Sequence, residues 1–479
     1  MCGSPIRYSS LCQENNHNKN NVPAHSIMTP SPQEHDECHH DSRQQTIMFE
    51  TVVASMNEMV ELWKMNDTFW IDSSSDRRCF IHRDIYGRKF SNQVLPYQTS
   101  TGRIESSKDC GIVSMTAMEL IHNFLDPVKW MNLFPTIVTK AKTIEVLESG
   151  TWEGSMQLMH ILSPLVEARE FFFVRCCRQL DATWIMSWKF PSNCAIQDMG
   201  NGQSKVTWVE HVQVYEKYQV NHIFRDLLCD REAYGAKRWI VTLQRMYERF
   251  NFQMDSTCPT RHDFKGLFHD PEGLKNTIQL SQRMVKSFFE ILSMTDNHGD
   301  FLISSQLNRG DRISIRNNEE IIQPKGFISI ATTSLLLPLS FQDVFNFFKD
   351  DKTRNQPNNM HKEMLVLEET SIDEMGAFLV YAPIDLRAIT SIINGGDATK
   401  VPIFPSGIII SPDGRLSSNR DNTANAQNGS ILTVTFQIMI CGDNNPTSRQ
   451  QKMEVVASVH GVLSATILKI KEALGCFYL

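Results

Sequence analysis

The sequence predicts an α+β protein with two similar halves, each an antiparallel sheet that wraps around a long C-terminal helix. Short strand-like segments separated by Gly, Pro and Asn occur in two series, and each series ends in a long amphipathic segment. The chain has 479 residues, which is enough for two to three domains. A sheet that wraps around a helix encloses either a packed core or a cavity, so the pattern leaves both interiors open.

The first half follows a polar tail. Residues 1–45 are rich in Asn, His, Gln and Pro and have no periodicity, which predicts disorder. From Ile47 to Trp63 apolar residues recur at helical spacing, and a second helix is predicted over GIVSMTAMELIHNFLD. The predicted strands are TIEVLES, SMQLMHIL, EFFFVRCC, TWIMSWKF, CAIQDM and SKVTWVEHVQVY. Helical sequence from about 219 to 251 closes a first domain that we place at 46–251.

The second half repeats this order after a linker at 252–273 that contains Pro and Gly. A second domain is predicted over 274–479 and starts with a helix. The strand FISIATTSLLLP, the helix SFQDVFNFFKDD, the strands MLVLEET, AFLVYAP, SGIIISP and ILTVTFQIMI, and a final helix follow. The segment ELIHNFLD (119–126) lines up with DVFNFFKD (343–350), which indicates an internal repeat.

Composition narrows the class of protein. The formal charge is -7, and the chain has no run of five basic residues, which argues against binding nucleic acid through the overall field. The 12 cysteines are scattered without a C-x-x-C pair, as in an intracellular protein with reduced thiols. The longest apolar stretch, ILTVTFQIMI, is short for a membrane span, and no signal peptide is evident. We therefore expect a soluble intracellular protein without a transmembrane segment.

Several long strings resemble a known family. MTAMELIHNFLDPVKWMNLFPTIVTKAKTIEVLESG, SKVTWVEHV and AYGAKRWIVTLQRMYERF resemble the START (steroidogenic acute regulatory protein-related lipid transfer) domain of plant class IV homeodomain–leucine zipper proteins. ATTSLLLPLSFQDVFNFFKDD, VYAPIDL, INGGD, FPSGIIISPDG and ILTVTFQIMI resemble the conserved region that follows START in that family. The resemblance implies tandem helix-grip folds, a lipid-binding first domain, and a role in transcription regulation. It also implies a nuclear location, with the cytoplasm as the alternative.

The sequence also departs from the family pattern. Family members begin with a homeodomain and a zipper, whereas this sequence has no Trp-Phe-x-Asn recognition helix, no basic arm and no heptads before Ile47. We therefore expect no direct binding of nucleic acid. The strand regions of both halves look shortened, most clearly between Asp350 and Met364, so the sequence leaves open whether either domain retains a cavity.

No motif indicates an enzyme. G-x-S-x-G, G-x-x-x-x-G-K-[ST], H-E-x-x-H and the H-R-D kinase set are all missing, and we expect no catalytic residue and no cofactor. His35 and His39 lie in the unstructured tail, where only adventitious metal binding is expected. The C-terminal Cys476 has prenylation spacing, but aromatic residues stand where aliphatic ones belong, which favours a buried cysteine.

Two charged residues lie on otherwise apolar strand faces. Phe171, Phe173 and Arg175 share one face of EFFFVRCC, and Trp208 and Glu210 share one face of the strand SKVTWVEHVQVY. A buried charge needs a partner, so this pattern predicts an Arg175–Glu210 pair inside the first domain. The alternative is that one of the two lies near a strand end and reaches solvent.

By resemblance, polar groups in the apolar interior of a START domain orient a lipid head group. The candidate ligand-binding residues are Phe171, Phe173, Arg175, Trp208, Glu210, Trp239, Leu243 and Met246. The ligand would be a sterol, fatty acid or phospholipid, held without chemistry, and other transcription regulators would be protein partners. Two alternatives remain: a degenerate paralogue that acts only as a protein-interaction module, and a cytosolic lipid carrier.

Overall fold

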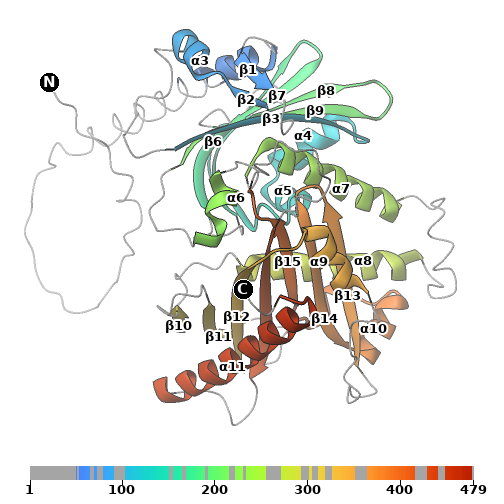
Figure 1. Cartoon of the computed structure of the whole chain (residues 1–479). Helices are drawn as coiled ribbons and strands as arrows, with labels where there is room; N and C mark the ends of the chain where they lie inside the picture. Colours follow the sequence, from blue (N-terminus) through green and yellow to red (C-terminus); the bar gives the residue numbers. More distant parts are fainter. Residues whose placement is uncertain are drawn as a thin grey trace, which may run out of the picture. The chain divides into compact units, whose positions relative to one another are not determined.

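Two seven-stranded antiparallel sheets organise the computed structural model (Figure 1). The structure describes residues 50, 53–54, 56–64, 69–72, 79–90, 103–149, 155–163, 169–188, 193–214, 222–229, 234–254, 271–292, 301–304, 311–318, 326–350, 364–415, 429–440 and 448–476. The tail at 1–45, with His35 and His39, lies outside these residues, as does most of the predicted linker at 252–273.

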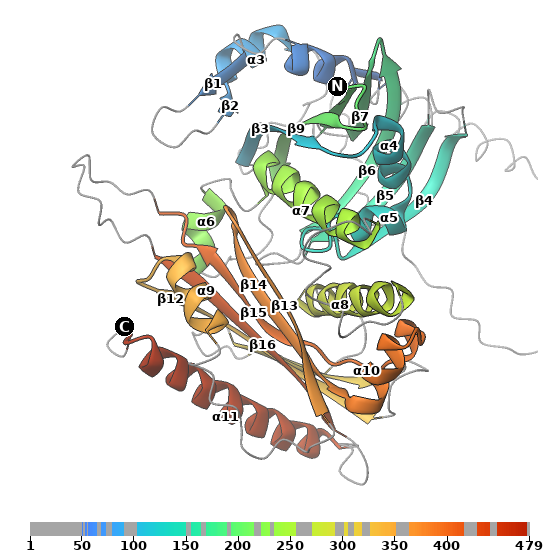
Figure 2. The same ribbon diagram turned by 90° about the vertical axis from the view of Figure 1, so that its right-hand side faces the viewer.

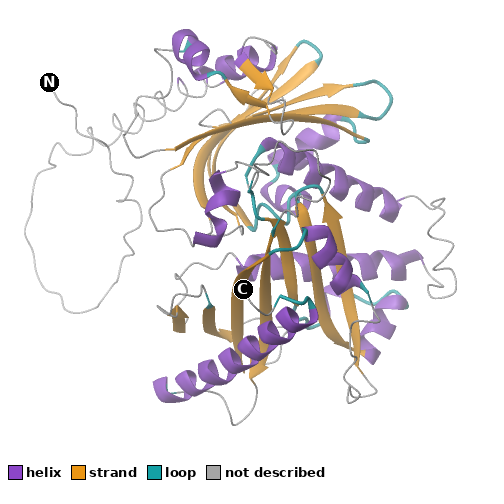
Figure 3. Ribbon diagram, in the orientation of Figure 1, coloured by secondary structure: helices purple, strands orange, loops and turns teal. Residues whose placement is uncertain are grey.

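The first sheet has the strand order β3-β9-β8-β7-β6-β5-β4. Its strands are β3 (Arg103–Val113), β4 (Lys140–Ser149), β5 (Ser155–Ser163), β6 (Arg169–Leu180), β7 (Thr183–Trp188), β8 (Asn193–Asp198) and β9 (Ser204–Val214). Helices α4 (Ala117–Leu125) and α5 (Pro127–Leu133) connect the two edge strands. The helices η2 (His222–Phe224), α6 (Arg225–Cys229) and α7 (Ala236–Met254) follow β9. Figure 3 shows these strands curving around helices on one face.

Helix α7 lies close to the edge strand β3. A Cβ atom at Gly111 would be 2.6 Å from the side chain of Ile240 and 2.7 Å from that of Gln244, so only glycine permits this approach. The first amide of the helix, on Ala236, donates a 2.9 Å hydrogen bond to the hydroxyl of Ser107 on β3. The edge strand therefore both caps α7 and fixes its distance from the sheet.

A second layer covers the other face of this sheet. It comprises the helical residues 56–64 together with β1 (Trp70–Asp72), β2 (Cys79–Ile81) and α3 (Arg83–Lys89). Their apolar side chains pack against three outward-facing strand residues, Ile185, Ala195 and Val209. Because β9 alternates, Trp208 points to the α7 side and Val209 to this outer layer.

The second sheet has the strand order β10-β11-β12-β16-β15-β14-β13. Its strands are β10 (Phe301–Ser304), β11 (Arg312–Asn318), β12 (Gly326–Leu337), β13 (Met364–Asp373), β14 (Gly376–Asp385), β15 (Ser406–Pro412) and β16 (Ser430–Ile440). The helices of this half are α8 (Pro271–Leu292), α9 (Phe341–Lys349), α10 (Leu386–Ile393), η4 (Ala398–Lys400) and α11 (Arg449–Ala473).

Helices cover both faces of the second sheet. On β14, Phe378 and Val380 pack against α8, while Ala377 and Leu379 pack on the opposite face with α9 and the end of α11. Figure 2 shows α8 and α11 on opposite sides of these strands. A strand that is buried on both faces needs a continuous apolar run, and AFLVYAP provides one.

Helix α11 packs on its own sheet through the buried residues Val456, Val459 and Leu463. By length and composition alone it could also cross a membrane: its most apolar window has a mean hydropathy of 1.4, and 22% of that window is buried. The apolar stretch ILTVTFQIMI forms strand β16. In the described part of the chain, the helix that is long and apolar enough to cross a membrane is α11. Its end contacts Cys476, which is buried in the second domain.

The two halves share one topology, which confirms the predicted α+β class with tandem helix-grip domains. In each half a strand (β3 or β12) leads to a helix that crosses to the far edge, and the returning strands end beside the starting strand. The crossing helices α4 and α9 begin at Thr116 and Ser340, whose hydroxyls both accept from the amide three residues on. They end at Asp126 and Asp350, at matching positions of the predicted repeat.

Three boundaries differ from the sequence prediction. The segment 111–113 belongs to β3 and not to a helix, because Thr116 caps the helix that starts at Ala117. The helical block at 219–251 divides into α6 and α7. Helix α8 starts at Pro271, inside the predicted linker, since proline suits the first turn of a helix.

Candidate functional site

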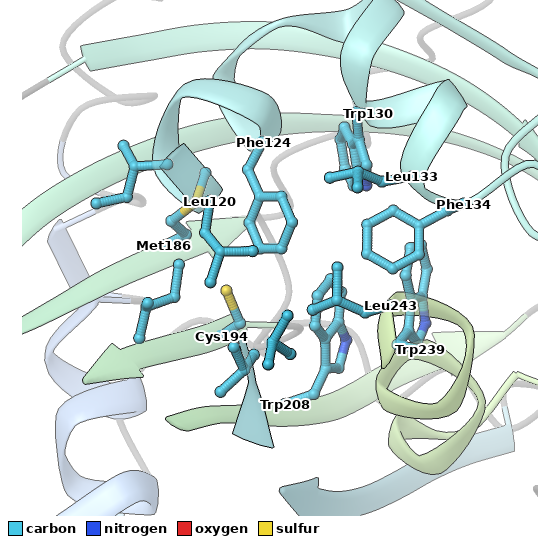
Figure 4. Packing of buried hydrophobic residues seen from close by; sticks show 14 of the residues in the cluster. Leu120, Phe124, Trp130, Leu133, Phe134, Met186, Cys194, Trp208, Trp239 and Leu243 are labelled. Atoms are coloured by element: carbon cyan, nitrogen blue, oxygen red, sulfur yellow. The ribbon is translucent and has the colours of Figure 1, made fainter. Parts of the chain in front are cut away.

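Four aromatic side chains meet in the interior of the first domain, between the sheet and its helices (Figure 4). The rings of Trp208 on β9 and Trp239 on α7 stack with centroids 4.6 Å apart and planes 9° apart. Phe134 lies edge-on to both, at 5.7 and 4.9 Å, and Phe124 lies 6.0 Å from Trp208. This aromatic cluster joins α7 to the strand that closes the sheet.

Helix α7 presents one apolar face to this interior. Trp239 and Leu243 are one turn apart and belong to the same buried core, and Met246 is buried further along the helix. Of the sequence-predicted residues, Trp208, Trp239 and Leu243 are therefore brought together. Phe171 and Phe173 lie on β6, and their side chains are outside the described residues.

Arg175 on β6 is fully buried, with 0% of its surface exposed. Its two terminal nitrogens donate to the backbone carbonyls of Phe124 and Leu125, at the C-terminal end of α4. The guanidinium also lies 5.3 Å from the centroid of the Trp130 ring. A helix C-terminus carries partial negative charge, so the end of α4 stabilises this cation.

Burial lowers the pKa of Arg175 to about 9, and the nearby carboxyl of Asp126 partly opposes this effect. Asp126 itself is held in place because it accepts hydrogen bonds from the amides of Val128 and Lys129 at the start of α5. The α4–α5 junction therefore fixes both the carbonyls and the carboxyl that surround the guanidinium.

Glu210 has a different environment from Arg175. It is half-buried on β9, and the indole nitrogen of Trp208 donates to its carboxylate at 2.8 Å. Strands β7 and β8 separate β6 from β9 in the sheet. The structure therefore shows contacts of Arg175 with the end of α4 and of Glu210 with Trp208 that the sequence did not predict.

Two buried thiols border the aromatic cluster. Burial raises the pKa of Cys177 to about 12 and that of Cys194 well above its usual range, so neither is a ready nucleophile. Both belong to the same core as Phe124, Trp130 and Phe134. The sequence analysis did not name any of these residues: Phe124, Trp130, Phe134, Cys177 and Cys194. The apolar spacing in ELIHNFLD was a signal for Phe124.

The outward face of α7 carries basic residues that pair with β13 and the turn after it. Arg245 lies 3.0 Å from both Ser371 and Asp373, and Arg249 pairs with Glu369. These ion pairs are mostly shielded from solvent. The helix that carries Trp239 and Leu243 is therefore held on both sides, by apolar packing inside and by charge outside.

A separate titratable cluster lies beneath the outer layer of the first sheet. The hydroxyl of Tyr86 on α3 donates to the carboxyl of Glu58, and its ring lies 4.7 Å from that of His211 on β9. Burial raises the pKa of Glu58 to about 7, while the hydrogen bond from Tyr86 lowers it less. Burial and the neighbouring Glu58 carboxyl both raise the pKa of Tyr86.

An antiparallel sheet curved around a terminal helix, with an apolar interior between them, defines the class of helix-grip domains. The family model of the START domain matches residues 51–189 and 185–249, and that of the PDF2-like C-terminal domain matches 270–361 and 356–476. These matches cover both sheets and their helices.

The curated relatives are plant proteins. The chain is 35% identical to homeobox-leucine zipper protein HDG11 and 35% identical to HDG8, both of Arabidopsis thaliana. Each match covers 90% of this chain, and 67% and 70% of the respective relative. Protein ROC8 of Oryza sativa subsp. japonica is 32% identical over 90% of this chain and 71% of its own length. The chain belongs to the START-containing family of plant homeobox-leucine zipper proteins, class IV.

Solved structures with a similar chain path include human StAR-related lipid transfer protein 5, with a TM-score of 0.29 and 14% identity over 43% of this chain and 99% of that chain. The di-domain ARO/CYC StfQ from the steffimycin biosynthetic pathway has a TM-score of 0.23 and 10% identity, over 77% of this chain and 97% of its own.

Proposed function

We propose that the first domain is a non-enzymatic binding module for one amphipathic lipid, and that Arg175 contacts the polar head group. The observation that carries this proposal is a fully buried guanidinium in an otherwise apolar interior. A buried cation is costly, and the carbonyls at the end of α4 and the nearby Asp126 carboxyl surround this guanidinium. A lipid carboxylate or phosphate would add charge-assisted hydrogen bonds to it, so a fatty acid or phospholipid fits better than a neutral sterol.

The test is the lipid that the purified full chain carries. We expect lipid extraction and mass spectrometry to find a fatty acid or phospholipid with the wild type. Arg175→Met keeps a long, flexible apolar side chain, so it should retain the fold but lose the acidic lipid. Arg178→Met changes an exposed arginine on the same strand and serves as the matched control. A wild type without lipid, or an unchanged lipid in Arg175→Met, would contradict the proposal.

A second candidate function is a protein-interaction module with a filled interior. The aromatic cluster favours it, because Trp208, Trp239 and Phe134 pack directly against one another where a ligand would approach α7. A lipid-free wild type supports this candidate if Trp208→Ala then gains binding of a small apolar probe such as benzene, since the deletion opens an apolar cavity. Binding of the same probe by the wild type would count against it.

The role of a lipid carrier is disfavoured by the position of α7. A carrier must release its ligand rapidly, whereas ion pairs from Arg245 and Arg249 hold the outer face of this helix against β13. We expect slow transfer of fluorescent lipid between vesicles by the full chain. If the transfer rate approached the rate at which the protein collides with acceptor vesicles, the carrier function would be the better proposal.

By family membership the domain pair would act in transcription regulation, in the nucleus and together with other transcription regulators. Because the overall charge is -7 and the sequence contains no homeodomain recognition motif, this chain would not read DNA bases by itself. We expect no sequence-selective gel shift with the purified chain, and nuclear fluorescence of a tagged chain in plant cells. A selective shift that resists salt would overturn the first expectation.

A further inference from the structure

Helix α7 contacts the interior of the first domain with one side and the second domain with another. Trp239 and Leu243 belong to the buried core of the first domain. Arg245 and Arg249 instead form ion pairs with β13, the edge strand of the second sheet. The helix that closes one interior is therefore also part of the contact between the two domains.

The contact with β13 consists of charge-assisted hydrogen bonds that are shielded from water. Both terminal nitrogens of Arg249 donate to the carboxylate of Glu369, and the hydroxyl of Ser281 on α8 donates to the same carboxylate. The guanidinium of Arg245 lies 3.0 Å from the carboxylate of Asp373. The four charged side chains are only 19 to 24% exposed, so solvent and salt screen these pairs less than they screen surface pairs.

The short helix before α7 makes a second contact with the same domain. Leu227 on α6 packs in one apolar cluster with Ile431 on β16. A Cβ atom at Gly414 would lie 2.5 Å from the Cα atom of Leu227, so the two backbones approach closely. Arg415 pairs with Asp226 at 2.9 Å. The second domain therefore holds the α6–α7 segment at two separate places.

The first interior must rearrange to admit the apolar tail of a ligand. The Trp130 ring lies 5.3 Å from the guanidinium of Arg175 and 6.3 Å from the ring of Trp239, which stacks on Trp208. Rings packed this closely leave little room for an acyl chain among the described side chains. An acyl chain that reaches Arg175 must therefore displace Trp239, and we expect α7 to move outward with its tryptophan, against the second domain.

We propose that the second domain is an autoinhibitory clamp on α7, in which Glu369 and Asp373 keep the first interior closed until a ligand displaces the helix. This inference rests on the lipid-binding function proposed above. The closed form has both ion pairs with β13, whereas a lipid-bound form with α7 displaced loses part of them. Such coupling is reciprocal: the ion pairs weaken lipid binding, and a bound lipid weakens the docking of the second domain.

Substitutions in the second domain test the clamp, because they leave the lipid interior unchanged. In the full chain, Glu369→Gln should raise the affinity for a fluorescent anthroyloxy-stearate about five- to tenfold, because it destabilises the closed form. Lipid entry and release should both become faster, with the larger gain in entry. Glu368→Gln removes a carboxylate from the opposite face of β13 and should leave the affinity unchanged.

A double-mutant cycle shows whether the effect passes through the α7–β13 contact. Arg249→Met breaks the same ion pair from the other side, so it should also raise the affinity for the labelled stearate. The double variant Arg249→Met/Glu369→Gln should gain less than the product of the two single effects, because the pair can be broken only once. Asp373→Asn weakens the pair with Arg245 and replaces Glu369→Gln in the test if that variant does not fold.

A second measurement needs no ligand. In the lipid-free full chain, Glu369→Gln and Arg249→Met should speed amide hydrogen exchange in α7 severalfold, because the clamp no longer opposes opening of the helix. Glu368→Gln should keep the exchange rate of the wild type. The expected result is faster exchange in α7 together with a higher affinity for the labelled stearate.

The possible failures are distinguishable. Equal stearate affinity in Glu369→Gln, Glu368→Gln and the wild type would overturn the clamp and leave the lipid function standing. Unchanged exchange of α7 in the clamp variants would also overturn it, with or without lipid. If α7 exchanges faster, but no variant binds stearate and the purified chain carries no lipid, the lipid function itself fails and the autoinhibitory role fails with it.

Discussion

The interiors of the two sheets differ in the charged groups that they bury. Among the described residues, the first domain buries Glu58, Glu105, Arg175 and His211, whereas the second domain buries Asp413. Asp413 accepts a 3.0 Å hydrogen bond from the amide of Arg415 and so stabilises a local turn. The comparison shows that one topology can build a core that buries several ionisable side chains and a second core that buries few among the described residues.

The largest expected loss of stability follows a substitution in the aromatic cluster. Trp208→Ala should lower the free energy of unfolding by about 3 to 5 kcal/mol, because it removes a buried ring and leaves a cavity. Leu432→Ala is the matched change on the corresponding closing strand of the second sheet, and should cost about 2 to 5 kcal/mol. Urea unfolding, followed by hydrogen exchange of each sheet, would show whether each loss stays in its own half. Equal loss of hydrogen-exchange protection in both sheets would show that the two interiors do not unfold as separate cores.

The next effect is a pH dependence that arises from Glu58 in the first domain. The folded pKa of Glu58 is raised from 4.5 to about 7, so the folded state binds the proton more tightly than the unfolded state. Its stabilising contribution is complete below pH 4.5 and is lost as the pH rises through 7, by roughly 3 kcal/mol. Glu58→Gln should remove this decline from the unfolding free energy, whereas Glu61→Gln, at an exposed ion pair, should not. The same decline in Glu58→Gln would assign it to another group.

A smaller effect is expected from the ion pairs outside α7. Arg249→Met should cost about 1 to 2 kcal/mol, because it leaves the half-buried carboxylate of Glu369 without its cation. Lys237→Met, at an exposed pair with Glu374, should change stability by less than about 0.5 kcal/mol. If the lipid proposal holds, only Arg249→Met should also speed lipid release, measured by fluorescence. Identical behaviour of the two variants would show that α7 is held by its apolar face alone.

The smallest expected effect compares the two crossing helices directly. Thr116 and Ser340 cap α4 and α9, and replacing either by alanine should cost about 1 kcal/mol. The loss at Thr116 should be slightly larger, because Glu119 also bonds back to the amide of Thr116 and completes a capping box. Chemical denaturation of the two variants measures the difference. A larger loss at Ser340 would show that packing, and not capping, fixes these helices.

Alternation and repetition made most of the fold predictable. Strand β9 alternates apolar and polar residues, strand β14 carries a continuous apolar run, and the repeat of ELIHNFLD identified equivalent helices. The strand β3, with the sequence RIESSKDCGIV, was missed because it is polar and its inward face holds Ser107 and Gly111. These small residues are required by the closeness of α7, which depends on the tertiary structure.

The tryptophans of the candidate site could be predicted from the sequence, because Trp208 and Trp239 follow from strand and helix periodicity. The hydrogen bonds from Arg175 to the backbone carbonyls at the end of α4 could not, because residue types do not indicate which carbonyls lie near a side chain. Residue types alone suggested a charged side chain, Glu210, as the partner.

The shared topology also has a consequence for how the protein forms. The strand before the crossing helix in each half pairs with the last strand of its sheet: Arg103 with Val214 in one half and Phe327 with Ile440 in the other. More than about a hundred residues separate these partners, and contacts of such long range slow folding. During synthesis the edge of β3 or β12 that pairs with this last strand must therefore stay unpaired until nearly a whole domain has left the ribosome. Exposed strand edges promote aggregation. The polar sequence of β3 reduces that risk while β3 has no partner strand.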